Sequence, residues 1–134
     1  MDKAFFFSIL FVSWLVFITY FSLFSFTGEM STPMLNIPHI DKIVHFLFYF
    51  IFVVLGIKAV REIFKVNLEL KKVLLYFVIF ACAYGVIIEL LQYGFTENRQ
   101  GDMLDVLANS MGALAGMFVV KRLVFKGWSL KGKV

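Results

Sequence analysis

Ten polar side chains stand out in an otherwise apolar chain, because acids, amides and a histidine recur among them at helical spacing. They are Asp41, Lys42, His45, Tyr49, Glu89, Gln92, Arg99, Asp102, Asp105 and Asn109. Carboxylates and an imidazole can transfer protons as general acids and bases. Arginine and lysine can bind a phosphate or a carboxylate through charge-assisted hydrogen bonds. The set is therefore suited either to acid–base catalysis or to recognition of a charged headgroup.

The catalytic interpretation has a specific candidate base. His45 follows Asp41 by one helical turn, so the carboxylate is placed to orient the imidazole. Glu89 and Asp105 supply further carboxylates for acid–base work, and Arg99 can stabilise a phosphoryl or oxyanion charge. These roles depend on residue type alone, because the sequence has no nucleophile elbow and no P-loop. Whether the chain is an enzyme stays open at this stage.

A metal site is a further possibility for four of these side chains. His45, Glu89, Asp102 and Asp105 offer imidazole and carboxylate ligands of the kind that bind divalent cations. None of their spacings is diagnostic of a metal motif, and the single Cys82 cannot build a zinc site or an intramolecular disulfide. We therefore predict no metal and no cofactor.

Helical periodicity tests whether the polar side chains can meet. At ~100° per residue, each of three segments gathers its unusual residues on one face. The three faces are Asp41, His45 and Tyr49; Gly85, Glu89, Gln92 and Tyr93; and Asp102, Asp105, Asn109, Gly112 and Gly116. Because the polar residues fall at the same end of a bundle, we expect them to form one site. The last two glycines form a GxxxG pair, for which we expect close helix packing.

The composition indicates that this bundle spans a membrane. The 134 residues are 61% hydrophobic and only 16% charged, with a mean hydropathy of +0.89. Soluble domains are about half apolar and about a quarter charged. The length allows about four spans with short connections, so we predict one all-α domain over residues 1–134, a four-transmembrane-helix bundle. The approximate spans are 4–26, 42–60, 73–93 and 102–121.

The first uncharged stretch is long enough to cross a bilayer, whereas the other three are short. Residues 4–28 carry no charge, and no signal-peptide cleavage site follows them, so we expect a retained helix. The runs 43–57, 73–88 and 106–120 each cover only ~23 Å of a ~30 Å hydrocarbon core. We therefore expect these helices to continue into their polar ends, which places the carboxylates near the headgroups.

The distribution of basic residues predicts the orientation. Most of the 13 lysines and arginines would lie on the side that holds both termini and the connection at 61–72. The positive-inside rule places this side, with both termini, in the cytoplasm, so the polar site faces outward. The expected partners include membrane lipids, because the basic tail attracts anionic headgroups, but no nucleic acid. The oligomeric state stays open.

The buried carboxylates Glu89 and Asp105 need compensation if they lie inside spans. A charged side chain at the centre of a span costs ~2.5–3.5 kcal/mol on insertion scales. These groups must pair with Arg99, Lys42 or His45, take up a proton, or line a wet cavity. A purely structural ion-pair network meets the same requirement, so it stays an alternative to a functional site.

Two stretches resemble the signatures of the VanZ-like family. DKIVHFLFYFIFVVLG, at 41–56, resembles its Asp-Lys-x-x-His-Phe-x-x-Tyr opening. YGVIIELLQYGFTENRQGDMLDVLANSMGALAG, at 84–116, resembles a Glu-x-x-Gln helix, an arginine-containing turn and then Asp-x-x-Asp-x-x-x-Asn-x-x-Gly. The match covers about half the chain, and its order is that of the family. The matching residues are the ten polar residues above and Gly112.

The resemblance implies a small integral membrane protein of mostly bacterial origin, located in the cytoplasmic membrane. The family takes its name from a member linked to resistance to teicoplanin, a lipoglycopeptide that acts on cell-wall precursors at the outer membrane face. No biochemical activity follows from the resemblance. Three hypotheses about function therefore stand side by side.

The first hypothesis is recognition of a lipid-linked cell-wall precursor, a lipid headgroup or a lipoglycopeptide. Arg99 and Lys42 would contact phosphate, and Tyr49 and Tyr93 would form amphipathic walls. The ligand-binding candidates are Lys42, Tyr49, Gln92, Arg99, Asp102 and Asn109. The second hypothesis is a membrane-embedded hydrolase or transferase that acts on a lipid-linked envelope substrate. The third is proton-coupled transport through the buried carboxylates.

Overall fold

The computed structural model describes residues 2–24, 39–64, 69–95 and 102–131, with side chains in the last segment described as far as Val124. Each segment forms one helix: α1 (Lys3–Phe24), α2 (Ile40–Phe64), α3 (Leu70–Phe95) and α4 (Met103–Lys131). All four are long and apolar enough to cross a membrane. These segments contain no strand. The prediction of an all-α bundle with four membrane-spanning helices is confirmed.

The helices run beyond the uncharged stretches of the sequence. α2 begins at Ile40, α3 ends at Phe95 and α4 begins at Met103, so the polar residues lie inside helices or at their ends. α2 has 25 residues and α3 has 26, which gives each a length of about 37–39 Å at ~1.5 Å per residue. This length exceeds the ~30 Å hydrocarbon core, so the polar turns can reach the headgroup level.

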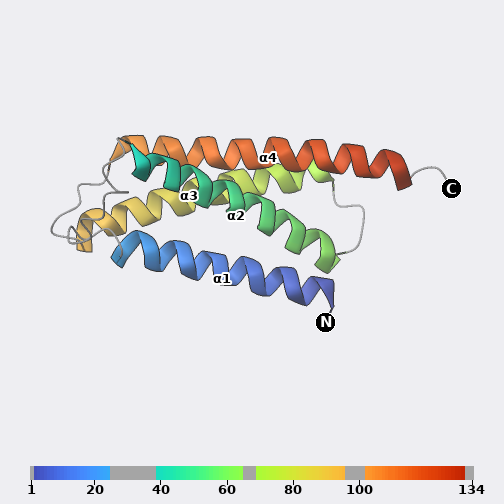
Figure 1. Ribbon diagram of the computed structural model, residues 1–134, viewed down its shortest axis with the longest axis horizontal. Coiled ribbons are helices and arrows are strands. Elements are labelled where there is room, and N and C mark those ends of the chain that lie inside the picture. Colours follow the sequence, from blue (N-terminus) through green and yellow to red (C-terminus); the bar gives the residue numbers. More distant parts are fainter. Residues whose placement is uncertain (1, 25–38, 65–68, 96–101, 132–134) are drawn as a thin grey trace.

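The four helices lie side by side and alternate in direction (Figure 1). One end of the bundle, which we call the terminal end, contains the start of α1, the end of α2, the start of α3 and the end of α4. The opposite end, which we call the site end, contains Phe24, Ile40, Phe95 and Met103. The segments 41–49, 85–92 and 102–109 all lie toward the site end, as the helical pattern predicts.

α2 is the central helix, because it packs against α1, α3 and α4 and most extensively against α4. The small residues of α4 make this contact close. A Cβ added to Gly112 would overlap the carbonyl oxygen of Phe46, and one added to Gly116 would lie 2.7 Å from that of Phe50. The GxxxG pair is therefore a packing face, and the side chains of α2 and α4 at the site end are brought together by it.

α1 lies at the edge of the bundle and faces mainly outward. Only Ile18 and Ser22 are buried on it. Long-range hydrogen bonds attach it to its neighbours: Trp14 Nε1 donates to the carbonyl of Phe48 at 3.0 Å, Gln92 Nε2 donates to that of Ser22 at 2.6 Å, and the Tyr84 hydroxyl donates to that of Leu15 at 3.2 Å. Edge-to-face aromatic contacts, such as that of Phe48 with Trp14, fill the α1–α2 seam.

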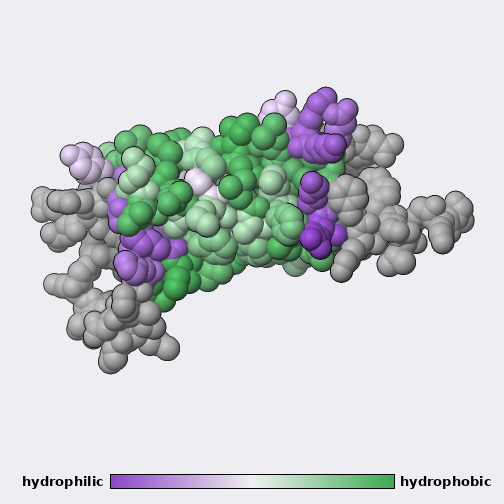
Figure 2. All heavy atoms as spheres, turned by 90° about the horizontal axis from the view of Figure 1, so that it is seen from above, coloured by the Kyte–Doolittle hydropathy of each residue, from purple (hydrophilic) through white to green (hydrophobic). Residues whose placement is uncertain are grey.

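The surface has the layered polarity of a membrane protein. Figure 2 shows an apolar belt around the middle of the bundle and hydrophilic side chains at both ends. Large apolar side chains on the outside include Val16, Tyr76, Leu90 and Phe118, each more than half exposed. In water such a belt would expose a large apolar surface to solvent, whereas in a bilayer it contacts the lipid acyl chains.

Candidate functional site

The polar residues of the site end form two layers, an outer cluster and an inner cluster. The outer cluster consists of Asp41, Lys42, Asp102 and Asp105, near the ends of α2 and α4. The inner cluster consists of His45, Tyr49, Glu89, Asp105 and Asn109, one to two turns deeper in the bundle. Asp105 belongs to both clusters, since one of its oxygens faces each. Every inner residue is at most 6% exposed.

Lys42 is the centre of the outer cluster. Its ammonium lies 2.8 Å from Asp41 Oδ2, 2.9 Å from Asp102 Oδ2 and 2.9 Å from Asp105 Oδ1. A lysine ammonium has three N–H donors, so three carboxylate partners use all of them. Lys42 therefore holds α2 against the start of α4 and has no donor left for a phosphate, contrary to the expected role of this lysine in phosphate binding.

Asp102 also forms the N-terminal cap of α4. Its Oδ1 accepts a hydrogen bond from the backbone N–H of Leu104 at 2.9 Å, which satisfies one of the free donors of the first helical turn. This backbone hydrogen bond and the neighbouring Lys42 ammonium lower the pKa of Asp102 below its ordinary value. The residue stays ionised at neutral pH, so both of its structural contacts are present there.

His45 is hydrogen-bonded to Asn109 of α4, whereas the helical spacing predicts Asp41 as its partner. Its Nδ1 lies 3.0 Å from Asn109 Oδ1, which can only accept a hydrogen bond, so Nδ1 carries the proton. Glu89 Oε1 lies 3.8 Å from Nδ1, and Asp105 Oδ2 lies 3.9 Å from Nε2. The expected partner, Asp41, instead contacts Lys42, because the axial rise of one turn moves it to the outer layer.

Two buried polar groups, the Tyr49 hydroxyl and the Asn109 amide nitrogen, have no hydrogen-bond partner among the described residues. Both lie beside Gly85, where an added Cβ would be 3.0 Å from Asn109 Nδ2 and 3.3 Å from Tyr49 Cε1. An unpaired buried polar group costs about 1–3 kcal/mol. The absence of a side chain at Gly85 therefore lets Asn109 and Tyr49 pack directly against the α3 backbone.

Three side chains of the inner cluster could hold a metal ion. His45, Glu89 and Asp105 each offer one ligand atom, and these atoms lie within 4.8 Å of one another. Imidazole and carboxylate ligands suit zinc, manganese or iron. Asp102, which the sequence pattern included among possible ligands, does not belong to this group.

The remaining candidates have different positions. Gln92 is 2% exposed and faces α1, where it donates to the Ser22 carbonyl, so it joins α3 to α1. Tyr93 is 72% exposed and lies outside the two buried clusters, so its role as an amphipathic wall stays a prediction. Arg99 lies outside the described residues.

Some contacts that support the site had no signal in the polar pattern. The backbone carbonyl of Ser22 accepts a hydrogen bond from Gln92. The Tyr84 hydroxyl on α3 donates to the carbonyl of Leu15 and contacts Thr19. Leu15, Thr19 and Ser22 belong to α1, whose hydrophobic stretch shows no polar face at the site end. A tyrosine and a threonine inside uncharged runs were the only available hint, because buried hydroxyls require partners.

The comparisons with known proteins agree with the motif resemblance. The VanZ/LLP1 family matches residues 4–126, a range that includes most of all four helices and every residue of the two clusters. Neither the curated proteins nor the solved structures gave a significant match. The match covers most of the chain and coincides with the four apolar helices that the structure describes. The chain therefore belongs to the VanZ/LLP1 family and is a VanZ-like membrane protein.

Proposed function

We propose that this protein binds the polar headgroup of a lipid-linked or other amphiphilic ligand at the site end of the bundle. The site end faces outward from the bacterial cytoplasmic membrane, and both termini are cytoplasmic. Binding there lowers susceptibility to lipoglycopeptides such as teicoplanin, either by capturing the antibiotic or by covering a cell-wall precursor. The acyl part of the ligand lies in the bilayer, next to the apolar belt of the helices.

The observation that carries this proposal is the charge of the outer cluster. Three carboxylates surround one ammonium, so the described cluster is anionic. The side chains of Asp41 and Asp102 are 35% and 43% exposed, and a carboxylate oxygen has the capacity to accept more than one hydrogen bond. The ligand group complementary to the described cluster is therefore an amine or a set of sugar hydroxyls.

A binding measurement on the full chain in lipid nanodiscs tests this proposal. Teicoplanin is the probe. The same glycopeptide without its acyl chain is measured beside it, and the difference between the two affinities shows how much the acyl chain contributes to binding. The double variant Asp41→Asn/Asp102→Asn is expected to bind teicoplanin at least about tenfold more weakly, which corresponds to ~1.4 kcal/mol. The Asn side chain at 102 still caps α4, so the fold is retained.

The matched control removes the same charge at the terminal end. Asp2→Asn/Glu69→Gln alters two exposed acids that lie far from the site and should leave the affinity unchanged. Equal affinity of wild type and the Asp41/Asp102 variant would contradict the proposal. In cells, expression of the wild type is expected to raise the inhibitory concentration of teicoplanin, and the site variant is expected to abolish this increase.

A second candidate function, a membrane-embedded hydrolase or transferase, is favoured by the grouping of His45, Glu89 and Asp105. With Nδ1 donating to Asn109, Nε2 of His45 is the ring nitrogen that faces Asp105, at 3.9 Å from its Oδ2, and is the candidate base or metal ligand. This function predicts turnover of a lipid-linked precursor that His45→Ala abolishes while binding persists. Elemental analysis of the purified wild type and of Glu89→Gln would show whether a divalent metal takes part. No turnover by the folded wild type would count against catalysis.

A further inference from the structure

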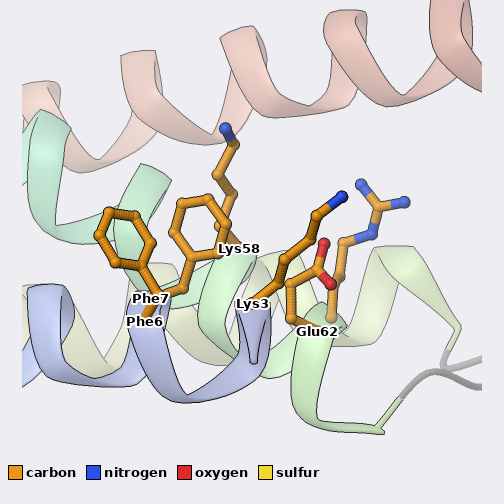
Figure 3. Close-up of a pocket in the computed structure, with 6 residues that line it drawn as sticks. Lys3, Phe6, Phe7, Lys58 and Glu62 are labelled. Atoms are coloured by element: carbon orange, nitrogen blue, oxygen red, sulfur yellow. The ribbon is translucent and has the colours of Figure 1, made fainter. Parts of the chain in front are cut away.

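A cavity lies at the terminal end, at the opposite end of the bundle from the two polar clusters. It has a volume of about 530 Å³ and opens between the first turns of α1 and the last turns of α2. Its lining residues are Lys3, Phe6, Phe7, Lys58, Arg61 and Glu62. We call it the α1–α2 pocket (Figure 3). Cavities of this size hold small ligands and lipid headgroups.

The charge of the α1–α2 pocket is opposite to that of the outer cluster. Lys3, Lys58 and Arg61 supply three cations, and Glu62 is the single acid. The ammonium of Lys58 lies 5.1 Å from the centre of the Phe7 ring, a cation–π contact that holds this lysine over the apolar wall. The pocket therefore favours an anion, and the guanidinium of Arg61 suits a phosphate or carboxylate in particular.

The position of the pocket selects an amphiphile as its ligand. It lies at the terminal end of the bundle, where its lining combines the apolar rings of Phe6 and Phe7 with charged side chains (Figure 3). On α1, Phe5, Phe6, Ile9 and Leu10 are all more than a third exposed and continue from the pocket toward the middle of the membrane. A ligand with an anionic head in the pocket can thus lay its acyl chains on this surface.

We propose that the α1–α2 pocket is a binding site for an anionic phospholipid. The lipid phosphate is held by Lys58 and Arg61 of α2 and by Lys3 of α1, and its first acyl carbons contact the Phe6 and Phe7 rings. Basic pockets between membrane helices bind anionic headgroups in this way on the cytoplasmic side. Because the lipid contacts both helices, it fastens α1, which is otherwise the most lipid-exposed helix, to the centre of the bundle.

The test compares lipids that share acyl chains but differ in charge. The full chain is prepared in detergent with mixed phosphatidylglycerol and phosphatidylcholine, and the retained lipids are counted by native mass spectrometry. The wild type is expected to retain phosphatidylglycerol at least about tenfold more often than phosphatidylcholine. Each cation near the membrane surface attracts the anionic headgroup and contributes to this preference. The variant Lys58→Gln/Arg61→Gln is expected to lose this preference.

A matched control separates a specific site from general attraction by a basic surface. Lys71→Gln/Lys72→Gln removes the same charge at the same end, from exposed positions at the start of α3 outside the pocket. This control is expected to keep the preference. Equal loss in both double variants, or no preference in the wild type, would overturn the proposal. The swap Lys58→Arg/Arg61→Lys keeps the charge and should keep the preference, which guards against loss of folding.

Soluble anions distinguish a lipid site from a phosphate site. Glycerol phosphate or inorganic phosphate, added at millimolar concentration, should not displace the retained phosphatidylglycerol, because neither contacts the apolar surface of α1. Displacement by either would show that the pocket recognises phosphate without its lipid, which contradicts the proposal. The lipid should also raise the melting temperature of the wild type more than that of Lys58→Gln/Arg61→Gln.

Discussion

At the scale of single residues, the site depends on hydrogen bonds in which Lys42 and the Nδ1 of His45 use all of their N–H donors. Lys42 uses its three N–H groups on three carboxylates, and His45 uses its Nδ1 proton on Asn109. Each arrangement compensates charges or dipoles that would be expensive inside a membrane protein. The outer cluster therefore has a structural role as well as the proposed recognition role.

Removing the Lys42 ammonium should destabilise the bundle. Lys42→Gln leaves three carboxylates around one point without a cation, and we expect a loss of roughly 1.5–3 kcal/mol in the free energy of unfolding. The side chains of Lys42 and Asp105 are only 19% and 9% exposed, so solvent screens the pair weakly. An SDS titration of the protein in mild detergent measures the loss. A double-mutant cycle with Asp105→Asn should give a coupling energy of about 1–3 kcal/mol.

The control for this cycle is the exposed pair of Lys72 and Glu69, whose side chains are 67% and 69% exposed. Exposed ion pairs contribute little, so its coupling energy should be below about 0.5 kcal/mol. Similar coupling energies for the two pairs would show that burial does not strengthen the outer cluster.

At the scale of the helices, the distance between α2 and α4 decides whether the site forms. Gly112 and Gly116 bring the α4 backbone against the carbonyls of Phe46 and Phe50. This close approach allows side chains from helices far apart in the sequence, His45 and Asn109, to reach hydrogen-bonding distance. Backbone carbonyls cannot rotate away as a side chain can, so the contact tolerates no added atom.

Gly112→Ala should therefore separate α2 from α4. We expect an overpacking cost of about 1–3 kcal/mol or more in the free energy of unfolding, and weaker teicoplanin binding. Gly94→Ala is the matched control, because a Cβ at this position in α3 meets nothing within 4 Å. Alanine has the higher helix propensity, so the control should be neutral or slightly stabilising. A neutral Gly112→Ala would show that the helices can shift without cost.

At the scale of the whole molecule, the two ends of the bundle have opposite character. The site end carries the anionic outer cluster, and the terminal end carries the cationic α1–α2 pocket. Between them the described core is apolar, with Phe52, Val53, Ile57 and Ala113 all fully buried. Within the described helices, the stretches 4–24, 46–57, 73–88 and 106–120 contain no carboxylate and no histidine to relay a proton, which favours recognition at one face over proton-coupled transport.

The orientation in the membrane can be tested by labelling. In a background of Cys82→Ala, we expect His39→Cys, at the site end, to react with a membrane-impermeant maleimide added to intact cells. Lys72→Cys, at the terminal end, should react only after lysis, because the positive-inside rule places this end in the cytoplasm. Both positions are exposed in the structure. Labelling of Lys72→Cys in intact cells would reverse the predicted orientation and move the α1–α2 pocket outside.

The sequence by itself determined the membrane class, the four helices and most residues of the two polar clusters. Its signals were strong, because a long apolar run can cross a bilayer only as a helix and a carboxylate inside it is costly enough to be rare. Helical periodicity then placed Asp105, Asn109 and Gly112 on one inward face, which the structure shows buried.

Only the tertiary structure decided which partner each polar group takes. The sequence pattern paired His45 with Asp41 and reserved Lys42 for a phosphate, whereas His45 is bonded to Asn109 and Lys42 to three carboxylates. Spacing along a helix predicts the direction in which a side chain points, but it does not predict the distance between two helices. That distance comes from the backbone contact of Gly112 with Phe46, and it determines which side chains of α2 and α4 lie close enough to bond.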